Sequence, residues 1–130
     1  MKNTIFKLTE HVYYFSLLVL LILYLFPGSL IGYLLYGNLG QQPNLISNPI
    51  GTSINHLIFF SYITILAMTV RLRAKNILTN YRFILFISCV LEILHLIIPN
   101  RAFELNDLLA NSSGVIFAFF LCNIVKKLKN

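Results

Sequence analysis

The chain has 130 residues, of which 58% are hydrophobic and only 11% are charged. Soluble domains carry about 25% charged residues, so this composition excludes a water-soluble globule, and it excludes a disordered chain because such chains are poor in apolar residues. The length has room for one domain. The net charge of +6 comes from basic residues in short groups between long apolar runs, which excludes nucleic acid as a partner.

Four apolar stretches follow one another along the chain. A membrane span needs about 20 predominantly apolar residues, because about 30 Å of hydrocarbon is crossed at about 1.5 Å per residue. No stretch shows the strict alternation of barrel strands. We therefore predict an all-α membrane protein, a single domain over residues 1–130 that forms a four-transmembrane-helix bundle. Its spans are expected at about 12–27, 54–70, 77–98 and 108–125.

The first stretch follows Lys2 and Lys7, as a signal peptide would, but it ends in Pro27-Gly28 instead of a small-residue cleavage site. We therefore expect an uncleaved first span. Residues 28–53 then form an outer loop that is longer than a turn needs. Its apolar part, residues 30–36, is expected to lie flat in the outer interface; the alternative is that it continues the first helix past a kink at Pro27.

The placement of lysine and arginine predicts the orientation, because cytoplasmic loops carry an excess of both. If the four helices alternate across the membrane, nine of the ten cationic residues fall on one side and only Arg101 falls on the other. The first outer connection, residues 38–53, carries no charge. We therefore predict that both termini face the cytoplasm.

Ionisable residues within a bilayer are informative, because each costs about 2.5–3.5 kcal/mol at the centre of a helix. Glu92 is the deepest, about 9 Å inside the outer end of the third span by helical rise, and His95 follows on the same helix face. Antiparallel spans bring further polar residues to this depth, the outer third of the bundle. The predicted functional cluster consists of His56, Glu92, His95, Arg101, Asp107 and Asn111.

Several of these residues also have structural explanations. Asp107 suits the N-cap of the fourth helix, and Asn111 can bond to a neighbouring helix. Arg101 can form an exposed ion pair with Glu104, and His56 can act as a polar anchor at the interface. These roles do not exclude function.

Glu92 has the least convincing structural explanation, because a buried carboxylate needs a proton, a cation or hydrogen-bond donors. Arg101 and the two histidines of the cluster are its candidate partners. Gly114 and Ala118 form a small-xxx-small pair, which predicts close packing of the fourth helix against a neighbour.

Metal chemistry has weak support in the sequence. Glu92 and His95 form one Glu-x-x-His motif, whereas metal sites in helical bundles use two. Cys89 and Cys122 lie in apolar helices without metal-site spacing, so we expect them to be reduced packing residues. We therefore predict neither a metal nor another cofactor.

The segment from Glu92 to Gly114 resembles the signature of the VanZ-like family of small bacterial membrane proteins. That signature is a Glu near the end of one helix, an Arg in the following loop, and then Asp, Asn and Gly at the start of the next helix. Glu92, Arg101, Asp107, Asn111 and Gly114 stand at these positions. Asn55-His56 resembles the other marked position of the family, although Ser53, Phe60 and His95 stand where many members have Lys, Tyr and Gln.

The resemblance implies a multi-pass protein of the bacterial plasma membrane that acts in the cell envelope. The founding member is associated with low-level resistance to the glycopeptide teicoplanin, and relatives occur near genes for surface polysaccharide production. The biochemical activity of the family is not established, so whether this chain is an enzyme stays open.

Three functions are consistent with these residues. In the first, the outer cluster binds a glycan or the headgroup of a lipid-linked precursor, with Arg101 on a phosphate or carboxylate and the acids and Asn111 on hydroxyls. In the second, the protein is a structural or assembly subunit that docks a membrane-protein partner or a second copy of itself. In the third, it is a small membrane enzyme that uses a histidine as general base and Glu92 as its partner. Membrane lipids are expected partners in all three.

Overall fold

The computed structural model describes residues 2–43, 51 and 53–129, and every regular element in these ranges is a helix. The helices are α1 (Lys2–Leu25), α2 (Leu30–Tyr36), α3 (Ser53–Val70), α4 (Tyr81–Leu94) and α5 (Leu105–Lys129). Three of them, α1, α3 and α5, are long and apolar enough to cross a membrane. The predicted all-α class is therefore confirmed, and these three helices indicate a membrane protein.

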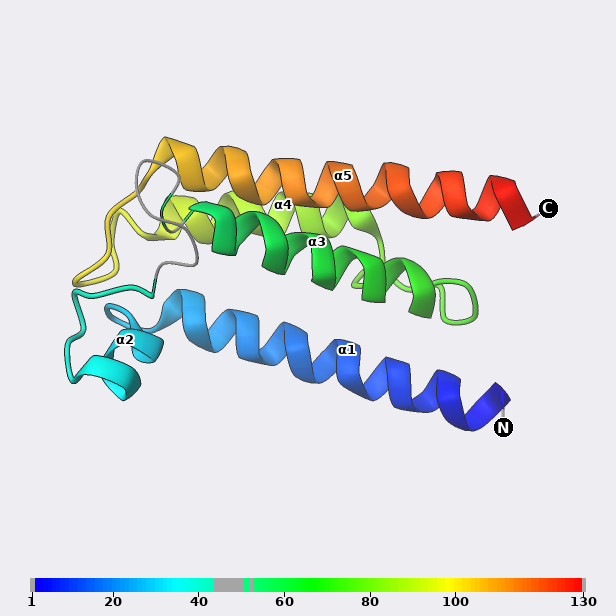
Figure 1. Cartoon of the computed structure of the whole chain (residues 1–130), viewed down its shortest axis with the longest axis horizontal. Helices are drawn as coiled ribbons and strands as arrows, with labels where there is room; N and C mark the ends of the chain where they lie inside the picture. The colour runs from blue at the N-terminus through cyan, green and yellow to red at the C-terminus, as the bar shows by residue number, and fades with distance from the viewer. Residues whose placement is uncertain (1, 44–50, 52, 130) are drawn as a thin grey trace.

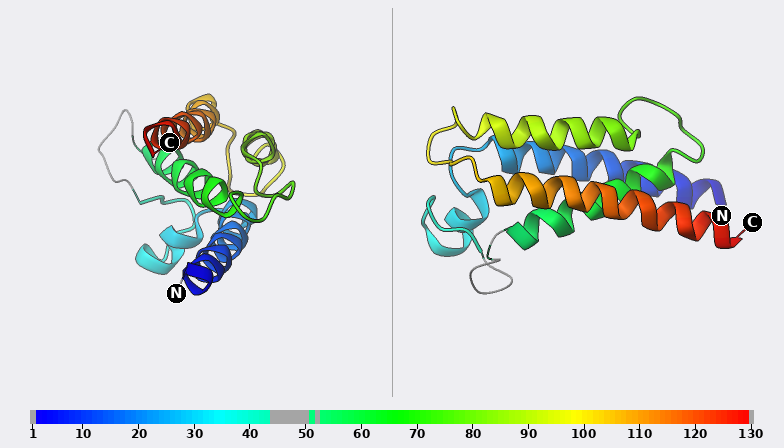
Figure 2. Two further views of the ribbon diagram at one scale, coloured as in Figure 1. Left: turned by 90° about the vertical axis from the view of Figure 1, so that its right-hand side faces the viewer. Right: turned by 90° about the horizontal axis from the view of Figure 1, so that it is seen from above.

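The four longer helices lie side by side, and each runs antiparallel to the next one along the chain (Figure 1). The beginning of α1, the end of α5 and the connection from α3 to α4 lie at one end, which we call the termini end. At the opposite end, the α2 end, lie α2 and the connection from α4 to α5. Figure 2 shows that α3 crosses the bundle between α1 and α5. The two connections that were predicted to lie on the outer side of the membrane, from α1 to α3 (in its described part) and from α4 to α5, therefore lie at the same end of the bundle.

The core of the bundle is apolar and draws on all four longer helices. It consists of Tyr13, Leu20, Tyr24, Phe60, Ile63, Ala67, Val70, Ile84, Leu91 and Val115. Gly114 allows the closest approach between helices, because a Cβ built there would lie 2.5 Å from the carbonyl oxygen of Leu57. Ser61 Oγ also donates to the Gly114 carbonyl oxygen at 3.1 Å. The predicted close packing at Gly114 is therefore present between α3 and α5, and Ala118 is buried one turn later.

The helix boundaries differ from the predicted spans in two ways. The first and last helices extend beyond the predicted spans, since α1 begins at Lys2 and α5 covers Leu105–Lys129. The third predicted span, 77–98, contains a helix only over Tyr81–Leu94. The Asn80 side chain accepts from the backbone N–H of Arg82 and thus caps the start of α4. After Leu94 the chain continues in tighter turns, in which the backbone N–H of His95 donates to the Glu92 carbonyl oxygen.

The segment after α1 forms a separate short helix. Gly28 has a φ of +90°, a left-handed conformation that ends the first helix, and Ser29 caps α2 by accepting from the Gly32 N–H. Continuation of α1 past Pro27 is therefore wrong. The apolar side chains of α2 are largely exposed, with Leu34 at 73%, as an interfacial segment requires. Residues 44–50 and 52 of the predicted outer loop lie outside the described residues.

Candidate functional site

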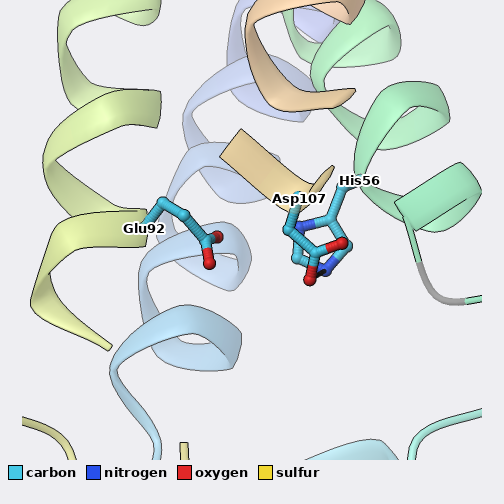
Figure 3. Close-up of side chains that lie close together, drawn as sticks. All are labelled: His56, Glu92 and Asp107. Carbon is cyan, nitrogen blue, oxygen red and sulfur yellow. Dashed lines mark ion pairs between the residues drawn. The ribbon is translucent and has the colours of Figure 1, made fainter. Parts of the chain in front are cut away.

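The structure brings all six predicted cluster residues to the α2 end. His56 belongs to the first turn of α3, Glu92 to the last turn of α4, and Asp107 and Asn111 to the first two turns of α5. Figure 3 shows the Glu92 carboxylate pointing from α4 toward His56 and Asp107 on the other two helices. Glu92 and Asn111 are fully buried, and His95 and Asp107 are nearly so.

His56 stands at the centre of the network. Its Nε2 lies 3.5 Å from Asp107 Oδ2, and its Nδ1 lies 2.6 Å from the Tyr24 hydroxyl. The same Nδ1 is 3.1 Å from Asn111 Oδ1. The imidazole therefore joins α1, α3 and α5 through its two nitrogens.

The Asn111 amide indicates which groups donate. Its Nδ2 donates to Glu92 Oε2 at 3.4 Å, so its Oδ1 faces the Tyr24 hydroxyl and His56. Tyr24 donates to that Oδ1 at 2.9 Å. Two acceptors at 3.1 Å would repel each other, so the geometry favours a proton on His56 Nδ1. His56 Nε2 is then the nitrogen that faces the carboxylate of Asp107.

Glu92 is buried but loosely held. Its Oε1 accepts from the Glu104 backbone N–H at 3.3 Å and lies 3.3 Å from His95 Nδ1. Together with the Asn111 contact at 3.4 Å, these distances exceed the roughly 2.7–2.9 Å of charge-assisted hydrogen bonds. The carboxylate thus has three partners in the described residues, and all three contacts are long.

Asp107 was expected to cap α5, and this expectation is wrong. It is the third residue of the helix, which begins at Leu105, and its side chain points toward α3. Ser53 Oγ donates to its Oδ1 at 2.5 Å, while Oδ2 faces His56. The carboxylate therefore links α3 and α5.

Arg101 contacts backbone oxygens instead of acids. Its Nη2 donates to the Leu23 carbonyl at 2.5 Å and its Nε donates to the Phe26 carbonyl at 3.3 Å. These carbonyls belong to the end of α1, where backbone oxygens lack helical partners. The alternative of an exposed ion pair with Glu104 is wrong, because among the described residues the acids within 4 Å of a basic side chain are Asp107, beside His56, and Glu92, beside His95. Burial lowers the pKa of Arg101 from its ordinary value, although nearby Tyr24 and Glu92 act in the opposite direction.

Tyr24 and Ser53 belong to the network but were not predicted. The Tyr24 ring stacks on His95 with centroids 5.3 Å apart, and its hydroxyl binds both His56 and Asn111. A tyrosine within an apolar run was a usable signal, because a buried hydroxyl needs a hydrogen-bond partner. For Ser53 the sequence offered no comparable signal.

A cavity of about 140 Å³ opens beside the network. Its polar lining residues include Asn55, His56, His95 and Arg101, and its apolar lining residues include Leu20, Leu23, Leu30, Ile31 and Phe59. The buried Oδ1 of Asn55 has no hydrogen-bond partner among the described residues. Of the six predicted residues, three therefore line the cavity, while Glu92, Asp107 and Asn111 lie behind them.

Comparison of the chain with protein-family models, curated proteins and solved structures gives no match. The geometry of the network and the cavity therefore carries the functional interpretation.

Proposed function

We propose that this chain is a multi-pass protein of the bacterial plasma membrane, similar to VanZ-like proteins, whose α2 end binds a glycan or the headgroup of a lipid-linked precursor. The observation that carries the proposal is a cavity that is lined by both polar and apolar residues. A lipid-linked headgroup presents both kinds of surface at the edge of a membrane. The cavity volume of about 140 Å³ is smaller than the roughly 300–1,000 Å³ of pockets that enclose whole small molecules. The cavity can therefore hold only one part of a ligand.

The polar lining residues offer complementary groups for such a headgroup. Arg101 donates from Nε and Nη2 to carbonyl oxygens. Its Nη1 has no hydrogen bond to the described residues, so Nη1 can donate to a phosphate or carboxylate. Asn55 Oδ1, which has no partner among the described residues, can accept from a hydroxyl. Glu92, Asp107 and Asn111 act indirectly in this scheme, because they orient His56 and His95.

A four-span topology with cytoplasmic termini is the second part of the proposal. It is supported by the antiparallel order of the longer helices and by the cationic residues Arg71, Arg73 and Lys75 at the termini end (Figure 1). Helix α4 has 14 residues and is only about 21 Å long. The turns that follow it up to Ile98 extend its path.

Cysteine labelling tests this topology. In a Cys89→Ala/Cys122→Ala background, single cysteines at Asn38 and at Lys127 are exposed to a membrane-impermeant maleimide in intact cells. We expect labelling of the first position only. Labelling of the carboxyl-terminal position from outside would refute the topology.

Binding of a polyprenyl phosphate to the protein in lipid nanodiscs tests the ligand. We expect Leu30→Trp, which fills the cavity, and Arg101→Gln each to weaken binding at least about tenfold, a loss of about 1.4 kcal/mol. Arg82→Gln, which removes an exposed cation outside the cavity, should bind as the original chain does. Equal binding by all four proteins would contradict the proposal.

An envelope phenotype provides the test in cells. A strain that depends on this chain for its growth in teicoplanin should lose that growth with Glu92→Gln or Asp107→Asn when the variant accumulates at normal levels. An unchanged phenotype with either variant would remove a functional role for the cluster.

An enzymatic role is a second candidate, because His56 lines the cavity with Asp107 behind its other face. In this role the imidazole proton would sit on Nε2, where Asp107 Oδ2 can accept it, and Nδ1 would be the base, as in other pairs of a carboxylate and an imidazole. Under this alternative, His56→Gln abolishes conversion of a lipid-linked substrate but leaves its binding intact. Retained conversion would exclude it.

A further inference from the structure

We propose that His56, Glu92 and Asp107 form a site for one divalent transition-metal cation such as Zn²⁺ or Mn²⁺. Each side chain offers one ligand atom, and the three atoms lie within 4.8 Å of one another. They come from α3, α4 and α5 and converge on one point between these helices (Figure 3). The proposal does not depend on the ligand of the neighbouring cavity.

The separations are close to those around a bound ion. With metal–ligand bonds of about 2.0–2.2 Å, two ligands of a tetrahedral ion lie about 3.4 Å apart. His56 Nε2 and Asp107 Oδ2 are already 3.5 Å apart. Glu92 is the ligand that must approach, and its three long hydrogen bonds leave it free to move.

The charge balance of the cluster favours a cation. The Glu92 side chain is 0% exposed and that of Asp107 is 6% exposed. In the described ranges, no lysine or arginine nitrogen lies within 4 Å of either carboxylate. The Arg101 guanidinium donates instead to the Leu23 and Phe26 carbonyl oxygens. Among basic side chains of the described residues, only histidines lie within 4 Å of the two buried carboxylates. A divalent cation between them would balance both charges.

The surroundings of the three residues are those of metal ligands. A ligating histidine usually donates its second ring N–H to a fixed acceptor, and ligating carboxylates are themselves hydrogen-bonded. His56 Nδ1 has Asn111 Oδ1 and the Tyr24 hydroxyl as partners, and Ser53 orients Asp107. These contacts direct His56 Nε2 and Asp107 Oδ2 toward the proposed ion.

The donor set selects the class of metal. One imidazole nitrogen with two carboxylate oxygens suits first-row transition metals, whereas Mg²⁺ and Ca²⁺ prefer oxygen alone. His56 also lines the cavity, which gives the ion a path from the surface. The sequence predicted no metal because its spacing shows a single Glu-x-x-His motif; the proposed site uses Asp107 from another helix instead of His95.

Metal titration of the whole chain tests the site. Protein in detergent is stripped with a chelator and titrated with Co²⁺, followed by visible absorption, and with Zn²⁺, followed by calorimetry. We expect one ion per chain. Asp107→Asn and Glu92→Gln should each weaken binding by more than about 100-fold, because changes outside the ligand shell alone cost about 10–100-fold.

Matched controls separate this site from adventitious binding. Glu104→Gln removes an exposed acid near the cluster, and His11→Gln removes an exposed histidine at the termini end. Both should bind as the original chain does. A loss in these controls as large as in Asp107→Asn, or the absence of stoichiometric binding, would overturn the proposal.

Two further measurements test the site even if Asp107→Asn or Glu92→Gln fails to fold. X-ray absorption of the Zn²⁺-loaded original chain should show nitrogen and oxygen ligands with one imidazole; sulfur ligands would refute the site. Ser53→Ala removes only the hydrogen bond to Asp107 and should weaken binding about tenfold. Unchanged affinity in this variant would contradict the role of Ser53 as an outer partner. No lipid ligand is present in these experiments, so their failure leaves the proposed function standing.

Discussion

The two ends of the bundle satisfy their polar groups in different ways. At the termini end, the connection from α3 to α4 bonds mostly within itself, as Asn76 and Thr79 exchange hydrogen bonds three residues apart. At the α2 end, Tyr24 and Asn111 bond although 87 residues separate them. The cations at the termini end are mostly exposed, whereas the acids of the cluster are buried. The comparison teaches that the buried polar groups of the α2 end depend on contacts between helices, whereas the connection at the termini end bonds mostly within itself and adds single hydrogen bonds to Asn3, Tyr13 and Tyr14 of α1.

Asn111→Leu should have the largest effect. It removes the shared partner of Tyr24, His56 and Glu92, and each unsatisfied buried group costs about 1–3 kcal/mol, for a total of about 3–9 kcal/mol. Unfolding by SDS in mixed micelles measures this loss. Asn123→Leu is the matched control on the exposed side of the same helix, and an equal loss there would contradict the importance of the network.

Gly114→Val tests the close approach of α3 and α5 beside the cluster. A Cβ at this position would collide with the Leu57 carbonyl, so the helices must separate, at a cost of about 1–3 kcal/mol. The same unfolding assay applies. Ser113→Val introduces the same side chain at the exposed neighbouring position; if it costs as much as Gly114→Val, the close contact is not the cause.

A pair of tyrosine variants compares the two ends directly. Tyr24→Phe leaves both His56 and Asn111 without its hydroxyl, whereas Tyr13→Phe removes one hydrogen bond to the Leu78 carbonyl. We expect losses of about 2 and about 1 kcal/mol respectively. The reverse order in thermal unfolding would show that the termini end is the more constrained.

Arg73→Gln should have the smallest effect. The Arg73 side chain is exposed, donates a hydrogen bond to Asn3 and lies over the Phe6 ring, and such surface changes usually stay within about 0.5 kcal/mol. A loss above 1.5 kcal/mol in the unfolding assay, roughly three times that range, would contradict the contrast between the ends.

The sequence predicted the helices well because long apolar runs have few alternatives. It also predicted that Glu92, Asp107 and Asn111 would meet, since antiparallel helices bring the residues beside alternate loops to one end. The length of α4 was not predictable from hydropathy, because Ile77 and Leu78 are apolar yet lie in a turn that Asn76, Thr79 and Asn80 organise.

The partners of individual side chains were less predictable. Arg101 was expected to meet an acid, but it binds the Leu23 and Phe26 carbonyls, whose positions depend on where α1 ends in space. Asp107 was expected to satisfy its own helix, but Ser53 on α3 lies closer to it. Such choices depend on tertiary distances, which residue types and spacing do not contain.

The span of 87 residues between Tyr24 and Asn111 has a consequence for synthesis in the cell. When the ribosome has delivered only α1, α2, α3 and α4, Glu92 has neither the Asn111 amide nor the Glu104 backbone N–H as a donor. A chain truncated at this stage therefore carries an acid that lacks two of its three hydrogen-bond partners and keeps only His95.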